Sequence, residues 1–72
     1  MTIVEAFGAR LQNIRKAQKL SQEKLAENSG LHRTYISSLE RGKRNPTLIT
    51  LQALAKALDI KIAYLVSEIE NE

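Results

Sequence analysis

Residues 30–46, GLHRTYISSLERGKRNP, concentrate side chains that form directed hydrogen bonds and carry positive charge. His32, Arg33, Thr34 and Ser37 lie between the apolar positions of this stretch, and three cations follow: Arg41, Lys43 and Arg44. Guanidinium, hydroxyl and imidazole groups recognise acceptors and donors on a ligand, and clustered cations attract an anionic partner. The pattern favours recognition of a polyanion.

Catalysis is not indicated by the remaining residue types. Asp59 is the only aspartate, His32 is the only histidine, and cysteine is absent. No nucleophile–base pair suggests itself, so we expect no enzyme activity. The same counts exclude disulfides and make a structural zinc site improbable, and we expect neither a metal nor a cofactor.

Charge is distributed unevenly along the chain. The net charge is +3, and residues 1–45 contribute nine Lys/Arg against four Glu, whereas residues 46–72 contribute two Lys against four acids. The basic N-terminal part favours binding of a polyanion, and the mildly acidic C-terminal part favours contact with some other partner. No apolar run reaches the roughly 18 residues of a membrane span. The N-terminus lacks a secretory pattern, so we expect a cytoplasmic protein without membrane contact.

A chain of 72 residues predicts a single domain covering residues 1–72. Such a short chain buries only about 60% of its unfolded surface. Without disulfides or metal, its stability must come from regular helix packing, from a partner subunit, or from both.

Capping signals and apolar periodicity divide the chain into five helices, which predicts an all-α fold. Thr2 with Glu5, Ser21 and Thr47 have N-cap spacing. The expected helices cover about residues 3–18, 22–28, 33–40, 47–58 and 62–69. Expected core faces comprise Phe7, Leu11 and Ile14, then Ile36 and Leu39, then Leu48, Leu51, Leu54, Ala55 and Leu58.

Residues 21–41, SQEKLAENSGLHRTYISSLER, have the size of two short helices joined by a tight turn. Ala26 keeps the helices close, and Gly30 permits the turn. With SQEKLA, GLHRTYISSLERGKRNPTL and LQALAKAL, the chain resembles the Cro/phage-repressor (XRE-type) helix-turn-helix family over about residues 5–66. HRTYIS followed by ERGKRN is most similar to the controller proteins of restriction–modification systems.

The resemblance implies a compact five-helix, lambda-repressor-like domain whose helix over 33–40 enters the DNA major groove. It implies base contacts from Arg33, Thr34, Ser37 and His32, and phosphate contacts from Gln22, Tyr35, Lys43, Arg44, Asn45 and Thr47. Plain surface positions remain the alternative for these residues, and the core is an even alternative for Tyr35.

Two further roles follow from the same resemblance. Arg15 and Glu40 match a structural salt bridge, with separate exposed charges as the alternative. Glu23 and Glu27 match acids that contact RNA polymerase, including its sigma subunit, in related activators. Solubility and complementing the helix dipole explain Glu27 at least as well, and Glu23 is the better candidate for the polymerase contact.

Residues 47–69 are expected to form a homodimer through Ile62, Leu65, Val66 and Ile69. The function so implied is a homodimeric regulator that binds an inverted-repeat operator and controls restriction–modification genes, including its own, by repression or activation. One alternative is an antitoxin or phage-type repressor. The other, of a different class, is a small helical protein-interaction module.

Overall fold

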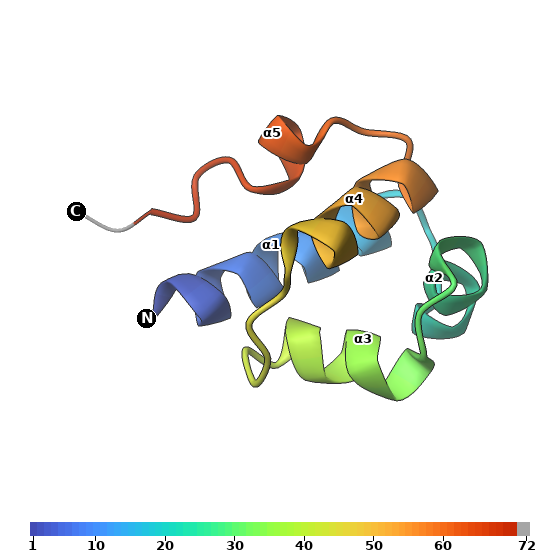
Figure 1. Cartoon of the computed structure of the whole chain (residues 1–72), viewed down its shortest axis with the longest axis horizontal. Helices are drawn as coiled ribbons and strands as arrows, with labels where there is room; N and C mark the ends of the chain where they lie inside the picture. The colour runs from blue at the N-terminus through green and yellow to red at the C-terminus, as the bar shows by residue number, and fades with distance from the viewer. Residues whose placement is uncertain (71–72) are drawn as a thin grey trace.

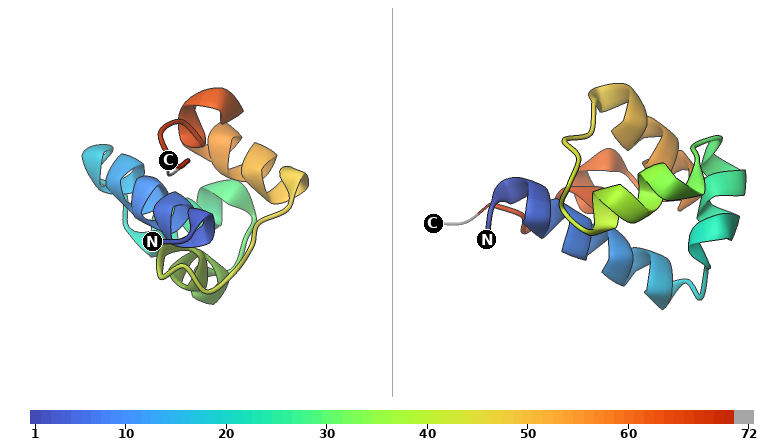
Figure 2. Two further views of the ribbon diagram at one scale, coloured as in Figure 1. Left: turned by 90° about the vertical axis from the view of Figure 1, so that its left-hand side faces the viewer. Right: turned by 90° about the horizontal axis from the view of Figure 1, so that it is seen from below.

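A computed structural model describes residues 1–70 of the chain. It contains five helices: α1 Ile3–Ala17, α2 Gln22–Ser29, α3 Arg33–Glu40, α4 Leu48–Ala57 and α5 Ile62–Leu65. No strand occurs within these residues, and the predicted all-α class is confirmed. Helix α3 packs on α1 and α2 at one side of the molecule, and α5 packs on α1 and α4 at the opposite side (Figures 1 and 2). None of the described helices is both long and apolar enough to span a bilayer.

The predicted N-caps are present and set where the helices begin. The Thr2 hydroxyl accepts from the Glu5 backbone N–H (3.1 Å), and the Glu5 carboxylate accepts from the Thr2 N–H (2.8 Å). Ser21 caps α2 through the Lys24 N–H (3.0 Å), and Thr47 caps α4 through the Thr50 N–H. These bonds satisfy backbone donors that a helix leaves unpaired at its first turn.

The hydrophobic core is formed by one face of each helix. Its fully buried side chains are Leu11, Leu25, Ile36, Leu39, Leu54, Leu58 and Leu65. The predicted faces of the first and third helices are confirmed by this cluster. The prediction for Leu48 is wrong, because its side chain is 78% exposed. It lies one turn before the half-buried Leu51, so the apolar stripe of α4 leaves the core at its N-terminal end.

Gly8 marks the closest approach of α1 to α3. A Cβ atom at this position would overlap the Leu39 carbonyl oxygen and lie 2.8 Å from that of Glu40. Both obstacles are backbone atoms of α3, which cannot move without shifting the helix. Glycine therefore permits the contact that fixes the end of α3 against α1, which outweighs its low helix propensity.

The last helix is shorter than predicted, because α5 ends at Leu65 rather than near Ile69. In a continuing helix the Tyr64 carbonyl would accept from the N–H of residue 68. Here it accepts instead from the Arg10 guanidinium (2.8 Å) and from the backbone N–H and hydroxyl of Ser67. The Arg10 guanidinium carbon also lies 4.6 Å from the Tyr64 ring centroid, so α1 holds α5 in place.

Candidate nucleic-acid interface

Helices α2 and α3 are joined by a turn of three residues, 30–32, at the outer surface (Figure 1). Gly30 adopts a left-handed conformation (φ 78°) and donates its N–H to the Ala26 carbonyl at 2.9 Å, which closes α2. His32 occupies the N-cap of α3 without a side-chain capping bond. Because the His32 side chain makes no capping bond, it remains available for an external contact at the start of α3.

The polar face of α3 points away from the core. Ile36 and Leu39 are fully buried, which turns the remaining side chains outward. Of the expected base contacts, His32, Arg33 and Thr34 are exposed and Ser37 is half-buried. The structure therefore places these four residues on or at the start of one surface helix, with the geometry that a major groove accepts.

Gln22 and Arg33, the first residues of α2 and α3, are hydrogen-bonded to each other. Arg33 Nη1 donates to Gln22 Oε1 at 3.1 Å. Gln22 Nε2 in turn donates to Glu40 Oε1 at 3.0 Å, at the other end of α3. The Gln22 amide thus links an expected phosphate contact to an expected base contact and orients the exposed guanidinium.

Arg15 and Glu40 form a bidentate ion pair between α1 and α3. Arg15 Nε lies 2.6 Å from Glu40 Oε2, Nη2 lies 2.9 Å from Oε1, and Nη1 donates to the Leu20 carbonyl. The exposed fractions of the two side chains are 8% and 1%. Because each remaining polar group has a partner, the pair satisfies the conditions under which a buried ion pair is tolerated.

The pKa values of this pair follow from its contacts. Burial opposes ionisation of Glu40, but hydrogen bonds from Arg15, Gln22 and Gln12, together with the Arg15 charge, hold the pKa of Glu40 below its usual value. The hydrogen bond to Glu40 raises the pKa of Arg15. Both groups stay charged, and a charged Glu40 is the acceptor that fixes Gln22.

A shallow hollow of about 460 Å³ opens beside α3, lined by His32, Thr34, Tyr35, Ser38 and Arg44. The Arg44 guanidinium carbon lies 5.5 Å from the centre of the Tyr35 ring. The Tyr35 and Thr50 hydroxyl groups are 3.4 Å apart, which connects α3 to α4. Sequence reasoning did not find Thr50, a buried threonine in an apolar stripe, although its polar type inside that stripe was a signal.

The segment between α3 and α4 carries the other expected phosphate contacts. Lys43, Arg44 and Asn45 are exposed. Thr47 is exposed too, and its hydroxyl caps α4 by accepting from the Thr50 backbone N–H, so this donor is not available to an anion. Gly42 packs directly on Glu5 of α1, because an added Cβ would lie 2.8 Å from Glu5 Cγ. This contact fixes the cationic segment against the N-terminal turn of α1.

The acids of α2 are exposed, with side-chain exposures of 72% for Glu23 and 70% for Glu27. Glu27 pairs with Lys24 at 2.9 Å. Glu23 lies 3.8 Å from Arg33, so it borders the start of α3. The two acids therefore differ in surroundings, since only Glu23 is near an expected base contact.

The four expected dimer residues are not equivalent. Ile62 is 37% exposed, and Val66 and Ile69 are partly buried against the core. Leu65 has no exposed surface, so its expected place in a dimer interface is corrected: it packs in the core of its own chain. The chain is short, and its core needs this side chain from the far end of the sequence.

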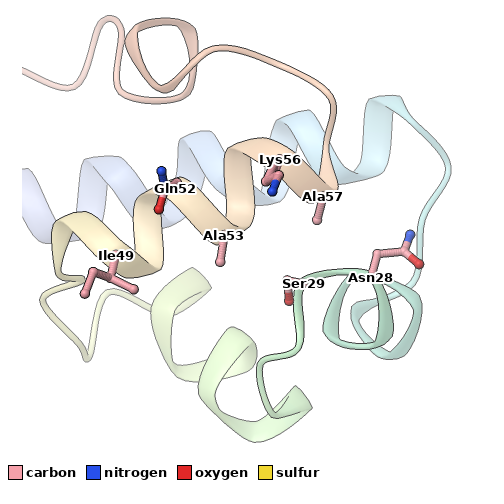
Figure 3. Close-up of a pocket in the computed structure, with 7 residues that line it drawn as sticks. All are labelled: Asn28, Ser29, Ile49, Gln52, Ala53, Lys56 and Ala57. Carbon is pink, nitrogen blue, oxygen red and sulfur yellow. The ribbon is translucent and has the colours of Figure 1, made fainter.

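A second groove, which no residue of α3 lines, lies between the end of α2 and α4 (Figure 3). It has a volume of about 530 Å³ and is lined by Asn28, Ser29, Ile49, Gln52, Ala53, Lys56 and Ala57. None of the side chains expected to contact DNA lines it. The expected DNA contacts therefore lie outside this groove.

Comparisons with known proteins give consistent matches. The Helix-turn-helix family model HTH_3 matches residues 11–65. The control protein C.SmaI of Serratia marcescens is 49% identical over 74 residues, covering 100% of this chain and 88% of that protein. The immunity repressor of Bacillus phage phi105 is 46% identical over 61 residues, covering 85% of this chain and 42% of that protein.

Among solved structures, the restriction-modification controller protein C.AhdI from Aeromonas hydrophila superimposes with a TM-score of 0.84. It is 48% identical in sequence, and the match covers 86% of this chain and 94% of that chain.

Proposed function

The chain belongs to the Helix-turn-helix family, and from this premise we propose that it regulates transcription of restriction–modification genes, its own among them, by binding an inverted-repeat operator as a homodimer. It is a DNA-binding regulator of the controller type, as its similarity to C.SmaI and C.AhdI supports. Residues 21–41 bind the operator, and residues 47–69 form the dimer. Genomic DNA as a ligand implies a cytoplasmic location.

One observation carries the proposal: the exposed polar face of α3 is flanked by the cations of segment 41–47 and oriented by a buried ion pair. Arg33 has the planar fork that binds guanine O6 and N7, and Thr34 and Ser37 extend along the same groove. Lys43 and Arg44 neutralise phosphates, which sets register without reading bases. A two-fold dimer then places two such helices about 34 Å apart.

The experiment is selection of bound duplexes from a random DNA pool, at two salt concentrations. Enrichment of an inverted repeat, with half-sites about one helical turn apart, supports a dimeric operator-binding regulator. Weak binding that enriches no sequence and disappears as salt rises would show a non-specific polyanion surface, and the protein-interaction module would replace the proposal.

A phage-type repressor is the second candidate, favoured by the 46% identity to the phi105 immunity repressor. The chain spans 42% of that protein's length, so its activity as a whole is not transferred here. The genes beside the selected operator distinguish the two: a methyltransferase and a nuclease support the controller, and phage lysogeny genes support the repressor.

Contact with RNA polymerase is a separate part of the proposal and rests on Glu23 and Glu27. Both carboxylates project from α2 into solvent, where a bound polymerase subunit could meet them. Glu23→Gln should lower activation of a reporter while operator occupancy stays unchanged, with Glu27→Gln as the matched variant. Full activation by both variants would refute this contact.

A further inference from the structure

Three hydroxyl groups form a chain that connects the start of α4 to α3. Thr47 Oγ1 lies 3.2 Å from Thr50 Oγ1, which lies 3.4 Å from the Tyr35 hydroxyl oxygen. Thr50 is only 8% exposed, and it belongs to the otherwise apolar buried face of α4. Burying a hydroxyl costs free energy unless it is hydrogen-bonded, and a valine of nearly the same shape would avoid that cost. The buried position of Thr50 therefore indicates a role for its hydroxyl.

The partners of each hydroxyl fix the direction of the chain. Thr47 Oγ1 accepts from the Thr50 backbone N–H at 3.1 Å and donates its own proton to Thr50 Oγ1. A threonine hydroxyl has one proton to donate. Among the described residues, the other partner of the Thr50 hydroxyl is the Tyr35 hydroxyl, so Thr50 donates to it. The Tyr35 oxygen thus accepts from inside the protein, and its own O–H remains to be donated outward.

The surroundings of Tyr35 suit an anionic acceptor for that proton. The Tyr35 side chain is half-buried and lines the hollow beside α3, and the Arg44 guanidinium carbon lies 5.5 Å from the centre of its ring. No acidic side chain is among the described residues that line this hollow. Hydrogen bonds to an ionised acceptor are shorter and stronger than neutral ones. A hydroxyl donor beside a guanidinium therefore favours a phosphate oxygen.

We propose that Thr50 is a positioning residue for DNA binding: through the hydroxyl chain it holds Tyr35 as the donor to one operator phosphate. Thr50 does not reach the DNA itself, because it is buried. The 3.4 Å contact is longer than a typical O–H···O hydrogen bond of about 2.7–2.8 Å, so it sets the direction of the Tyr35 proton more than it anchors the ring. This inference rests on the proposed function and names how one of its phosphate contacts is oriented.

Operators that carry a single neutral methylphosphonate locate the phosphate that Tyr35 contacts. Neutralising that phosphate should weaken wild-type binding about three- to tenfold, typical of one hydrogen bond. Tyr35→Phe and Thr50→Val should both lose most of this sensitivity there and keep it at other phosphates. Thr50→Ser, which retains the hydroxyl, should behave as the wild type. If no phosphate distinguishes the wild type from Tyr35→Phe, the inference fails.

Ser38→Ala is the matched control. The Ser38 hydroxyl lines the same hollow, but it donates to the Tyr35 backbone carbonyl at 2.7 Å and not to the Tyr35 hydroxyl. Ser38→Ala should therefore keep the wild-type sensitivity at the phosphate that Tyr35 contacts. A purely structural role of Thr50 predicts a different result, in which Thr50→Val lowers affinity but leaves its dependence on each phosphate unchanged. Far-UV circular dichroism and urea unfolding show that each variant folds.

A double-mutant cycle on the unmodified operator supplies the second measurement. Tyr35→Phe and Thr50→Val should each weaken binding about three- to tenfold. The double variant should lose at most about twofold more than either, because both changes remove the same hydrogen bond to DNA. Additive losses, or a Thr50→Val phosphate profile identical to that of the wild type, overturn the role of Thr50 and leave the proposed function standing. A wild-type chain that enriches no operator overturns the proposed function and this inference with it.

Discussion

Gln22 and Arg33 are joined by a hydrogen bond of 3.1 Å that links the first residue of α2 to the first residue of α3. Through the same amide, Gln22 donates to Glu40, which Arg15 holds from α1. Three helices therefore contribute to the orientation of one exposed guanidinium. In the proposed function, the Arg33 guanidinium forms hydrogen bonds with an operator base.

Replacing Gln22 should weaken operator binding more than it weakens the fold. Gln22→Ala removes the acceptor that orients Arg33, and we expect a loss of about 0.5–1.5 kcal/mol in binding, typical of one hydrogen bond. Gln12→Ala is the control, because Gln12 also donates to Glu40, at 3.4 Å, without contacting Arg33. Binding titrations of the two variants should differ. Equal losses would show that Gln22 acts only through Glu40.

Arg33 and Arg44 should differ in how they contribute to DNA binding. Arg33→Ala should cost about 1–3 kcal/mol and relax specificity at one base pair. Arg44→Ala should weaken binding evenly across sequences and reduce the salt slope by about one unit. Affinities for the selected operator and its single-base variants, measured over a range of salt, separate the two effects. Identical profiles would contradict the assignment of Arg33 to base reading.

Removing Arg15 should strongly destabilise the fold. Arg15→Met leaves the carboxylate of Glu40 in a site where its side chain is 1% exposed, and an unpaired buried charge costs about 3–5 kcal/mol. Urea unfolding measures the loss. Lys24→Ala is the control, because the Lys24–Glu27 pair is exposed and such pairs contribute at most about 1 kcal/mol. A similar small loss for both variants would show that Glu40 finds other partners.

Acid should weaken the fold through Glu40. Its pKa in the folded state lies below the reference value of 4.5, so the folded state binds fewer protons than the unfolded state. The resulting stabilisation is fully present above about pH 4.5 and is lost as pH falls through the folded-state pKa, at up to about 1.4 kcal/mol per pH unit.

Glu40→Gln is the comparison for this pH dependence. Urea unfolding between pH 6 and pH 3 should give a shallower decline for this variant, because its residue 40 does not titrate. Glu5, whose pKa is lowered by hydrogen bonds from the backbone and hydroxyl of Thr2, remains in both proteins and contributes equally. If the unfolding free energies of the two proteins declined in parallel with falling pH, Glu40 would not be the source of the acid sensitivity.

Gly8→Ala should destabilise the protein although alanine is the better helix former. Helix propensity alone favours alanine by up to about 1 kcal/mol. The added Cβ would lie 2.8 Å from the Glu40 carbonyl oxygen and overlap that of Leu39, and overpacking of this kind costs about 1–3 kcal/mol. Thermal unfolding of Gly8→Ala gives the net sign. A raised Tm would mean that α3 moves away at little cost.

Local chemistry made much of this protein predictable from its sequence. Thr2, Ser21 and Thr47 mark helix starts because capping involves residues within one turn of each other. Period-3.6 apolar spacing likewise predicted the buried faces of α1 and α3. Recognition of the family rested on contiguous motifs such as GLHRTYISSLERGKRNPTL, which include nearly every proposed DNA contact.

The tertiary structure decided what depends on neighbours distant in sequence. Leu48 and Leu65 both fit apolar stripes, yet the first is exposed and the second fully buried, because an apolar stripe does not specify where packed neighbours end. Helix α5 ends where the Arg10 guanidinium, more than fifty residues away in the sequence, donates a hydrogen bond to the Tyr64 carbonyl. The contacts of Gln22 with Arg33 and of Gly8 with α3 likewise exist only once separate helices meet.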